Sequence, residues 1–363
     1  MTLTVMQVLH QGGGAGSVTS TLHLSLGLAR AGVRIRFVCP PDSEVEGLAR
    51  GGGLEVLPLA LQAGKRQANA AALSDLLAHH PADLVNSQSS RDREALVRLA
   101  IRGRLGVPLV LTRRQVPRTF FLENWLASLA ADRVIAVSRA VAGSLRRKGT
   151  PAAKLVVIPN GLVTSRVDRR PTAADVEEWR RRIGWDPSRR TIGIVARAKD
   201  QKMVLRALAQ VKTPVRLVLA GVEPDGPLGE IAREVQPPHA AVCLPFTSEV
   251  RPLYELLEVV LLPSRIEGLS QSLLEAMALG KPVIASAAAG NLDLIRHETD
   301  GLLVPPLDPA AWAAAIDRVL GDPALAARLG SAATRTARET FALERTVERT
   351  LALYREMVGH PGA

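Results

Sequence analysis

Twice along this chain, short runs of apolar and β-branched residues alternate with longer amphipathic stretches, and this double alternation limits the fold more than any other feature. Gly, Pro, Asn or Asp stands at most of the joints, as turns require. Strands that alternate with helices of 10–15 residues indicate a parallel sheet covered on both faces. In the first half the pattern predicts strands 4–10, 33–39, 54–59, 83–86, 108–112, 133–137 and 154–158, with helices 18–31, 44–50, 68–80, 91–105, 121–130 and 139–148 between them.

The alternation stops at Pro159-Asn160-Gly161 and restarts near Thr191, after a polar stretch typical of a linker with one surface helix. The sequence therefore predicts an α/β fold class with two Rossmann-like, doubly wound parallel-sheet domains, residues 1–165 and 166–340. Ligands of such folds bind at the carboxyl ends of the strands, so we expect the chemistry in a cleft between two facing domains. The second half predicts strands 191–195, 215–220, 241–244, 259–262, 282–286 and 301–304, helices 203–211, 228–235, 250–257 and 271–279, and three closing helices, 309–320, 323–339 and 341–357.

Composition excludes several classes of protein. With 47% hydrophobic and 22% charged residues, the chain is not a disordered one. Its two cysteines, Cys39 and Cys243, cannot form a disulfide framework, which fits a reducing cytoplasm. The first residues lack the basic start of a signal peptide, and no apolar run reaches the length of a membrane span. The seven histidines form no spaced metal-binding set, so we expect no metal.

Positive charge is concentrated in the first half. The formal net charge is +11; residues 1–165 carry 20 Lys and Arg against 10 Asp and Glu, whereas the rest carries 26 against 25. A basic half beside a neutral half indicates that one domain faces an anionic partner, such as nucleic acid, phospholipid head groups or an anionic glycolipid. A charge that serves only solubility is the alternative.

Residues 263–283 carry the most informative chemistry. They follow the expected strand 259–262 and enter the helix 271–279. Gly268 lets backbone approach a ligand, and the N–H groups at the helix start favour an anion such as phosphate. A carboxylate such as Glu267 or Glu275 accepts two hydrogen bonds from a vicinal diol, so ribose and sugar hydroxyls suit it. Two solvated surface glutamates are the alternative that these residues alone leave open.

This segment resembles the acidic signature of the retaining family 4 glycosyltransferases, two glutamates separated by seven residues. The resemblance implies a GT-B fold, a nucleoside diphosphate sugar as donor, a glycan or lipid-linked acceptor, and no metal or other cofactor. It also implies that the helix 341–357 crosses back, so that residues 341–363 pack on the first domain. Around Glu267 and Glu275 the chain matches the signature at Pro263, Ser264, Gly268, Leu274, Ala276, Met277, Ala278, Gly280, Pro282 and Val283.

Other positions support the resemblance. Arg197 and Lys202 resemble the family's pair of cations at the donor diphosphate, where fixed positive charge stabilises the leaving group. Residues 12–16 resemble its glycine-rich loop, a backbone nest for anions. Residues 291–304 resemble the block that closes the donor site, with Asp293 where the family usually has Glu. The implied catalytic residues are Arg197, Lys202 and Glu267, and the implied donor-binding residues are Gly13, Gly14, Arg197, Lys202, Phe246, Glu267, Gly268, Leu269, Ser270, Leu274 and Glu275.

The acceptor side departs from the family. Residues 83–92 and 112–114 resemble runs of a bacterial branch that has histidines where this chain has Gln88 and Arg114. Glutamine still forms hydrogen bonds but cannot act as a base, although the leaving phosphate of a retaining enzyme can take the acceptor proton. The implied acceptor-side residues are Gly16, Gln88, Arg113 and Arg114. The branch implies work in envelope polysaccharide or lipopolysaccharide synthesis.

Residues 113–125 place three of the chain's eleven aromatic residues next to three arginines, Arg113, Arg114 and Arg118. Basic residues beside Phe and Trp fit shallow docking on an anionic membrane face or an anionic glycolipid acceptor. The same spacing of Phe121, Leu122 and Trp125 also fits the buried face of a helix. Both interpretations stay open.

The sequence therefore predicts a metal-independent retaining glycosyltransferase of the hexosyltransferase type. We expect it in the cytoplasm or peripheral on the inner face of the cell membrane, without a nucleic-acid partner. A nicotinamide-dependent oxidoreductase shares the strand and helix pattern, but Ser17 breaks the dinucleotide fingerprint and the strand 33–39 ends without a ribose-binding acid. A non-catalytic relative that binds a membrane or ligand through its basic half is compatible with Gln88 and Arg114.

Overall fold

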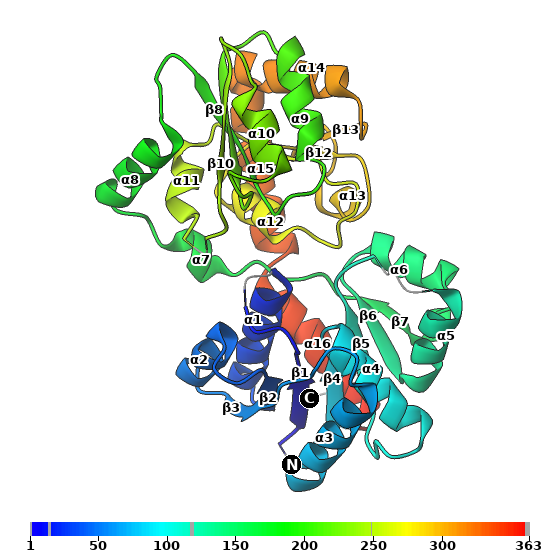
Figure 1. Cartoon of the computed structure of the whole chain (residues 1–363). Helices are drawn as coiled ribbons and strands as arrows, with labels where there is room; N and C mark the ends of the chain where they lie inside the picture. Colours follow the sequence, from blue (N-terminus) through cyan, green and yellow to red (C-terminus); the bar gives the residue numbers. More distant parts are fainter. Residues whose placement is uncertain (1, 14–15, 117–119, 248, 360–363) are drawn as a thin grey trace. The chain divides into compact units, whose positions relative to one another are not determined.

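The computed structural model describes residues 2–13, 16–116, 120–247 and 249–359. Its chain divides into two compact units: unit 1 is Met1–Gly161 with Leu343–Ala363, and unit 2 is Leu162–Ala342. Each unit is an α/β domain built on one parallel sheet, with seven strands in unit 1 and six in unit 2 (Figure 1). The sequence expectation of two doubly wound parallel sheets is confirmed.

The sheet of unit 1 has the strand order β3-β2-β1-β4-β5-β6-β7. The order reverses between β1 and β4, which is the switch point where doubly wound folds bind ligands. The strands are β1 (Thr4–Val8), β2 (Arg34–Cys39), β3 (Glu55–Pro58), β4 (Leu84–Ser87), β5 (Leu109–Arg113), β6 (Arg133–Ala136) and β7 (Leu155–Val157). The helices of this unit are α1 (Gly16–Arg30), α2 (Glu44–Gly51), α3 (Arg66–His79), α4 (Ser90–Ile101), α5 (Phe121–Ala130) and α6 (Arg139–Arg147).

The last helix, α16 (Leu343–Met357), belongs to unit 1 and lies beside α1 (Figure 1). The two helices approach closely at Gly27, where an added Cβ would lie 2.5 Å from Val347 Cγ2. Val347, Leu351 and Tyr354 join the core formed by the strands of unit 1. This packing brings the Tyr354 hydroxyl against strands β1 and β4, where it accepts hydrogen bonds from Gln7 and Asn86.

The sheet of unit 2 repeats the same plan with the order β10-β9-β8-β11-β12-β13, and its switch point lies between β8 and β11. Its core gathers around the fully buried Trp312. The strands are β8 (Arg190–Val195), β9 (Val215–Ala220), β10 (Ala240–Leu244), β11 (Val259–Leu262), β12 (Val283–Ser286) and β13 (Leu302–Val304). The helices are α7 (Thr164–Asp168), α8 (Ala173–Ile183), α9 (Gln201–Ala207), α10 (Pro227–Arg233), α11 (Arg251–Leu256), α12 (Gln271–Ala278), α13 (Asn291–Leu294), α14 (Pro309–Gly321) and α15 (Pro323–Arg335).

Several expected bounds were wrong at their ends. The strand expected over 4–10 ends at Val8, so His10 follows the strand instead of belonging to it. The helix expected over 91–105 ends at Ile101, because Gly103 adopts a positive φ of 65° that terminates it. The expected helix 323–339 changes to a π-helical turn over Thr336–Thr340. Helices α7 and α8 both lie in the stretch expected to hold one helix, and α13 was not expected.

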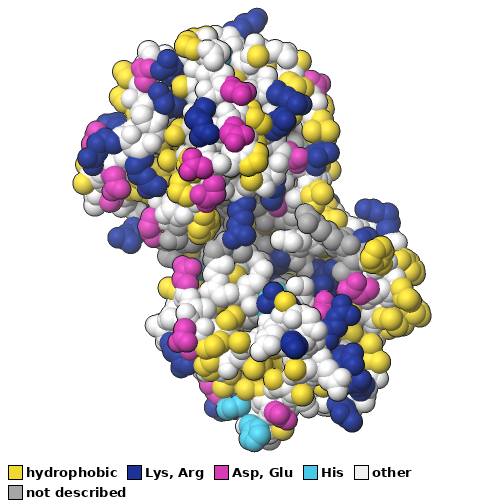
Figure 2. Space-filling model, in the orientation of Figure 1, with side chains coloured by type: hydrophobic (Ala, Val, Ile, Leu, Met, Phe, Trp, Pro, Cys, Tyr) yellow, Lys and Arg dark blue, Asp and Glu magenta, His cyan; other side chains and the backbone are white. Residues whose placement is uncertain are grey.

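Helix α5 exposes much of its apolar surface. Phe121 is 58% exposed, Leu122 60% and Trp125 38%, and Leu126 and Leu129 are also exposed. These side chains therefore do not form the buried face that the spacing allowed. In Figure 2, hydrophobic side chains gather where Figure 1 draws α5 and α6, with lysine and arginine side chains nearby. No helix among the described residues has the length and hydropathy needed to cross a bilayer.

Candidate active site

In unit 2, two loops meet at the carboxyl edge of the sheet, the edge at which its parallel strands end. The loop after β8 carries Lys199 and Asp200, and the loop after β11 carries Arg265 and Glu267. Asp200 accepts hydrogen bonds from the Arg265 backbone N–H at 2.9 Å and from its guanidinium at 3.0 Å. Lys199 forms an ion pair with Glu267. These contacts hold the two loops together on either side of the switch point.

The turn into α12 is fixed by a helix cap and by a glycine behind it. Ser270 caps the helix, and its hydroxyl accepts a hydrogen bond from the Leu273 N–H at 3.3 Å. Gly290 packs behind the turn, where an added Cβ would lie 1.7 Å from the Gly268 carbonyl oxygen. The Gly290 N–H also donates to the Glu267 carbonyl oxygen. The close packing of Gly290 and its hydrogen bond therefore hold the turn Gly268–Ser270 in place.

Helix α12 carries the second glutamate of the acidic signature. Glu275 is 8% exposed, so its carboxylate lies largely inside unit 2. Leu269 and Leu274, both expected at the donor site, are buried apolar side chains. A buried leucine shapes a site through packing and offers a ligand no polar group.

Arg197 and Lys202 are exposed cations beside the same loops. The Arg197 guanidinium carbon lies 5.9 Å from the ring centre of Phe246, a cation–π contact. The buried Gln201 side chain donates to the Arg197 carbonyl oxygen at 2.7 Å and fixes the backbone there. Within the described part of unit 2, neither cation has a carboxylate partner. Both positive charges are therefore available to an anionic ligand.

The sequence did not indicate two polar groups of this edge, Lys199 and Asp200, and it indicated a third, Asn291, only through the resemblance. The side chains of Lys199 and Asp200 form their hydrogen bonds with residues more than sixty positions away in the sequence, and a local sequence pattern does not reveal such contacts. Asn291, at the start of α13, donates to the carbonyl oxygens of Ser264 and Ser286, while its own buried carbonyl oxygen has no hydrogen-bond partner in the described structure. Its place in the resembling block 291–304 was the one available signal.

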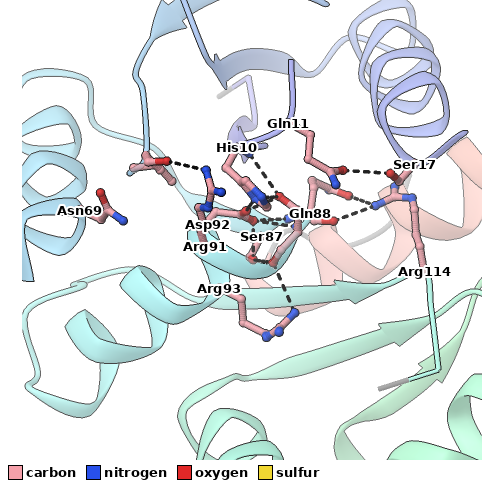
Figure 3. Close-up of polar contacts among 12 residues, drawn as sticks. His10, Gln11, Ser17, Asn69, Ser87, Gln88, Arg91, Asp92, Arg93 and Arg114 are labelled. Atoms are coloured by element: carbon pink, nitrogen blue, oxygen red, sulfur yellow. Dashed lines mark hydrogen bonds and ion pairs between the residues drawn. The ribbon is translucent and has the colours of Figure 1, made fainter. Parts of the chain in front are cut away.

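The carboxyl edge of unit 1 is organised by Asp92, a fully buried carboxylate at the start of α4. One of its oxygens accepts hydrogen bonds from the Ser87 hydroxyl at 2.7 Å and from the backbone N–H groups of Gln88 and Ser89 at 2.8 Å. The other accepts from the Ser89 hydroxyl and lies 3.0 Å from His10 Nδ1 (Figure 3). Burial alone would raise the pKa of Asp92, but these hydrogen bonds lower it below its ordinary value.

Gln88 is buried inside unit 1. Its amide nitrogen donates to Gln7. Its amide oxygen accepts a hydrogen bond from the Arg114 guanidinium (Figure 3). Arg114 is 9% exposed, and burial lowers its pKa to about 10. Gln88 therefore positions Arg114, and both polar atoms of its own side-chain amide have a partner.

Arg113 and the glycine-rich loop complete the expected acceptor side. Arg113 is buried against α5, donates to Asn124 at 3.0 Å and has a pKa lowered by burial to about 9. Gly13 lies beside Glu44, and Gly16 begins α1. Gly14 and Arg118 lie outside the described residues.

Two glycosyltransferase family models match this chain, one over most of unit 1 and one within unit 2. A family model described as "Glycosyl transferases group 1" matches residues 189–322, and one described as "Glycosyltransferase Family 4" matches residues 14–166. An uncharacterized glycosyltransferase of Methanocaldococcus jannaschii is 29% identical over 65% of this chain and 64% of its own length. A D-inositol 3-phosphate glycosyltransferase of Salinispora arenicola is 29% identical over 71% of this chain and 66% of its own length. The chain thus spans slightly less than two thirds of these curated relatives.

Solved structures show the same fold. HepE of Anabaena, crystallised with UDP-glucose, has a TM-score of 0.82 over 97% of this chain and all of its own, at 21% identity. A glycosyltransferase of Rickettsia africae has a TM-score of 0.83 over 99% of this chain and all of its own, at 18% identity. Both are GT-B proteins in architecture, as the resemblance implied.

Proposed function

This chain belongs to glycosyltransferase family 4, and we propose that it transfers a sugar, with retention and without a metal, from a nucleoside diphosphate sugar to a glycan or lipid-linked acceptor. The observation that supports the proposal is the carboxyl edge of unit 2, where Arg197 and Lys202, which have no carboxylate partner among the described residues, adjoin a helix start and two glutamates. HepE was crystallised with UDP-glucose, so uridine nucleotides are the first ligands to test.

Each residue of that edge has a proposed role. Glu275 accepts hydrogen bonds from the ribose hydroxyls, and Arg197 and Lys202 bind the diphosphate. Glu267 and the turn Gly268–Ser270 bind the sugar. As the bond between sugar and phosphate breaks, negative charge grows on the diphosphate and the two cations stabilise it. Fixed cations thus do the work that a metal ion does in other transferases.

A thermal-shift panel with UDP, GDP, ADP, NAD and NADP tests the donor site. A nucleotide at about 100 times its dissociation constant stabilises a folded protein by about 2.7 kcal/mol, which corresponds to a shift of about 5 to 10 °C. We expect one nucleoside diphosphate to give such a shift in wild type and in Glu230→Ala, an exposed glutamate on α10, and not in Glu275→Ala. A shift with NAD or NADP alone, indifferent to Glu275, would instead support an oxidoreductase.

We also propose that unit 1 docks on an anionic membrane face, where it meets an acceptor of the bacterial envelope. The exposed apolar side chains of α5 adjoin the basic end of α6: Phe121 and Trp125 cover Gly149, which follows the exposed Arg146 and Arg147. An apolar face flanked by arginines suits the boundary between anionic head groups and acyl chains. The same arrangement supports the alternative of a non-catalytic membrane-binding relative, which the nucleotide panel and a turnover assay separate from the enzyme.

A further inference from the structure

Arg113, the last residue of β5, is a buried cation at the carboxyl edge of unit 1. It is 6% exposed, and its Nη1 donates to Asn124 Oδ1 on α5 at 3.0 Å. Among the described residues, its Nε and Nη2 have no hydrogen-bond partner, and no carboxylate forms an ion pair with it. A buried positive charge without a paired carboxylate is costly to keep, so Arg113 needs a reason beyond its single hydrogen bond.

A second arginine faces Arg113 from the neighbouring helix. Arg93 lies near the start of α4, is partly buried, and donates to the Ser89 carbonyl oxygen at 3.3 Å (Figure 3). After burial, the positive charge of Arg93 is the next cause that lowers the pKa of Arg113, so the two guanidinium groups are close enough to repel each other. An anion that contacts both groups would remove this repulsion.

The start of α5 adds backbone donors beside these cations. The helix spans ten residues, and Phe120 at its N-cap has no side-chain oxygen to accept from the first N–H groups. Asn124 lies in the next turn, and its bond with Arg113 brings the guanidinium to this end of the helix. The Asn124 amide nitrogen donates to the Lys148 carbonyl oxygen at 2.9 Å and to the Thr150 hydroxyl at 3.0 Å, which fixes its orientation.

The adjacent Arg114 shows that a buried arginine alone does not mark such a site. Burial lowers the pKa of Arg114, but the negative charge of the fully buried Asp92 acts against this effect, and Gln88 Oε1 accepts a hydrogen bond from the guanidinium. The charge that offsets burial at Arg113 is instead Glu123, which is exposed on α5 and therefore screened by water. Arg114 has an internal counter-charge, whereas Arg113 lacks one of comparable strength.

We propose that Arg93, Arg113 and the start of α5 bind a phosphate group, as a monoester or a diester. The two guanidinium groups and the backbone N–H groups together offer positive charge and several donors to the phosphate oxygens. The exposed apolar face of α5 begins at the same place, since Phe120 is 85% and Phe121 58% exposed, so a lipid bound by its phosphate would lay its acyl chains along this face. The lipid form rests on the proposed membrane docking; the site itself lies within unit 1 and rests on neither the docking nor the sugar transfer.

Equilibrium dialysis of the whole protein against radiolabelled inorganic phosphate, at constant ionic strength, tests the site. The cations proposed for the donor diphosphate in unit 2 also attract phosphate, so the background is the double variant Arg197→Ala with Lys202→Ala. We expect this background to keep phosphate bound in unit 1. Adding Arg93→Met leaves the bond between Arg113 and Asn124 in place, so thermal stability without phosphate should be kept. The dissociation constant for phosphate should rise about tenfold or more.

Arg102→Met in the same background is the matched control. It removes an exposed arginine at the end of α4, and thus the same charge from the same helix, without touching the proposed site. Its phosphate binding should equal that of the background. Absence of phosphate binding in the background would overturn the proposal, and so would equal binding with and without the Arg93 guanidinium.

Competition with the labelled phosphate identifies the source of the phosphate group. The competitors are glycerol 3-phosphate and dihexanoyl phosphatidic acid, which carries the same phosphate monoester on a soluble lipid. Competition by the lipid that is about tenfold stronger supports the lipid form. Equal competition would overturn the lipid form and support a site for a soluble phosphate ester. The nucleotide shift that depends on Glu275 reports the proposed transfer separately, and its absence in wild type would leave the phosphate site standing.

Discussion

Asp92 is the residue on which the carboxyl edge of unit 1 depends most. The Asp92 carboxylate accepts several hydrogen bonds, and both of its oxygens are used. In Asp92→Asn one oxygen becomes an N–H₂ group, which donates hydrogen bonds and would therefore face other donors. We expect it to lower the free energy of unfolding by about 3 kcal/mol near neutral pH, measured by urea denaturation. Asp75→Asn, an exposed aspartate on α3, should change it by less than about 0.5 kcal/mol.

The effect of Asp92 has a defined pH dependence. Its folded pKa is lowered from the ordinary value of 3.8, so the unfolded chain takes up a proton more readily than the folded one. The stabilisation is therefore complete above that ordinary value and is lost as the pH falls through the folded pKa. The difference between wild type and Asp92→Asn should shrink below pH ~4; a difference that stays constant would mean that the carboxylate charge is not responsible.

Single residues also show what the sequence could and could not predict. Glu267, Gly268, Ser270 and Glu275 come from one contiguous signature that spans the loop after β11 and helix α12, so a resemblance in the linear sequence was enough to select them. His10 is 82 positions from Asp92, and that contact exists only because parallel strands β1 and β4 pair. Partners supplied by the tertiary fold leave no trace in a local pattern.

At the scale of elements, the start of α12 depends on Gly290 at the start of α13. Its φ of −67° is open to alanine, so the strain in Gly290→Ala comes from the Cβ that would meet the Gly268 carbonyl. We expect a loss of about 1–3 kcal/mol in stability and weaker nucleotide-sugar binding, measured by denaturation and calorimetry. Gly321→Ala, with no heavy atom within 4 Å of its added Cβ, should leave both unchanged; equal effects would show that the turn tolerates displacement.

The bounds of helices and strands were predicted well where the pattern of apolar residues is strong. They were predicted less well where a single residue decides where the element ends. Strands β9 and β11 match their expected ranges because buried parallel strands are continuous apolar runs. The end of α4 was missed because an amphipathic pattern continues past the glycine that stops the helix. α13 has only four residues, too few to show a helical period.

At the scale of the whole molecule, the two parallel-sheet domains were within reach of the sequence, since two runs of alternating strands and helices imply two doubly wound sheets. The exposure of the apolar side chains of α5 could not be predicted from the sequence. Its apolar spacing is the same for a helix packed on a core and for one facing outward, and only the packed structure distinguishes them. That exposure, together with the charge carried by unit 1, leads to a prediction about the whole molecule.

We expect the whole protein to sediment with vesicles that contain phosphatidylglycerol and not with pure phosphatidylcholine vesicles. The net charge of +11 lies almost entirely in residues 1–165, so attraction to anionic head groups should act through unit 1 and weaken as salt screens it. The apolar face of α5 would add burial once the surface is reached. Removing two of its side chains, Phe121→Ser with Leu122→Ser, should weaken binding about tenfold or more, because each contributes more than about 1 kcal/mol when buried.

The control for this double change is Ile101→Ser in α4. Ile101 is 60% exposed, as Leu122 is, but it lies on another helix of the same unit. Its replacement changes surface hydrophobicity to a similar extent without touching α5, so its vesicle binding should equal that of wild type. If both variants bind as wild type does, the positive charge alone holds the protein to the vesicles. If wild type fails to bind anionic vesicles at low salt, the exposed face of α5 does not dock on a membrane and that proposal is wrong.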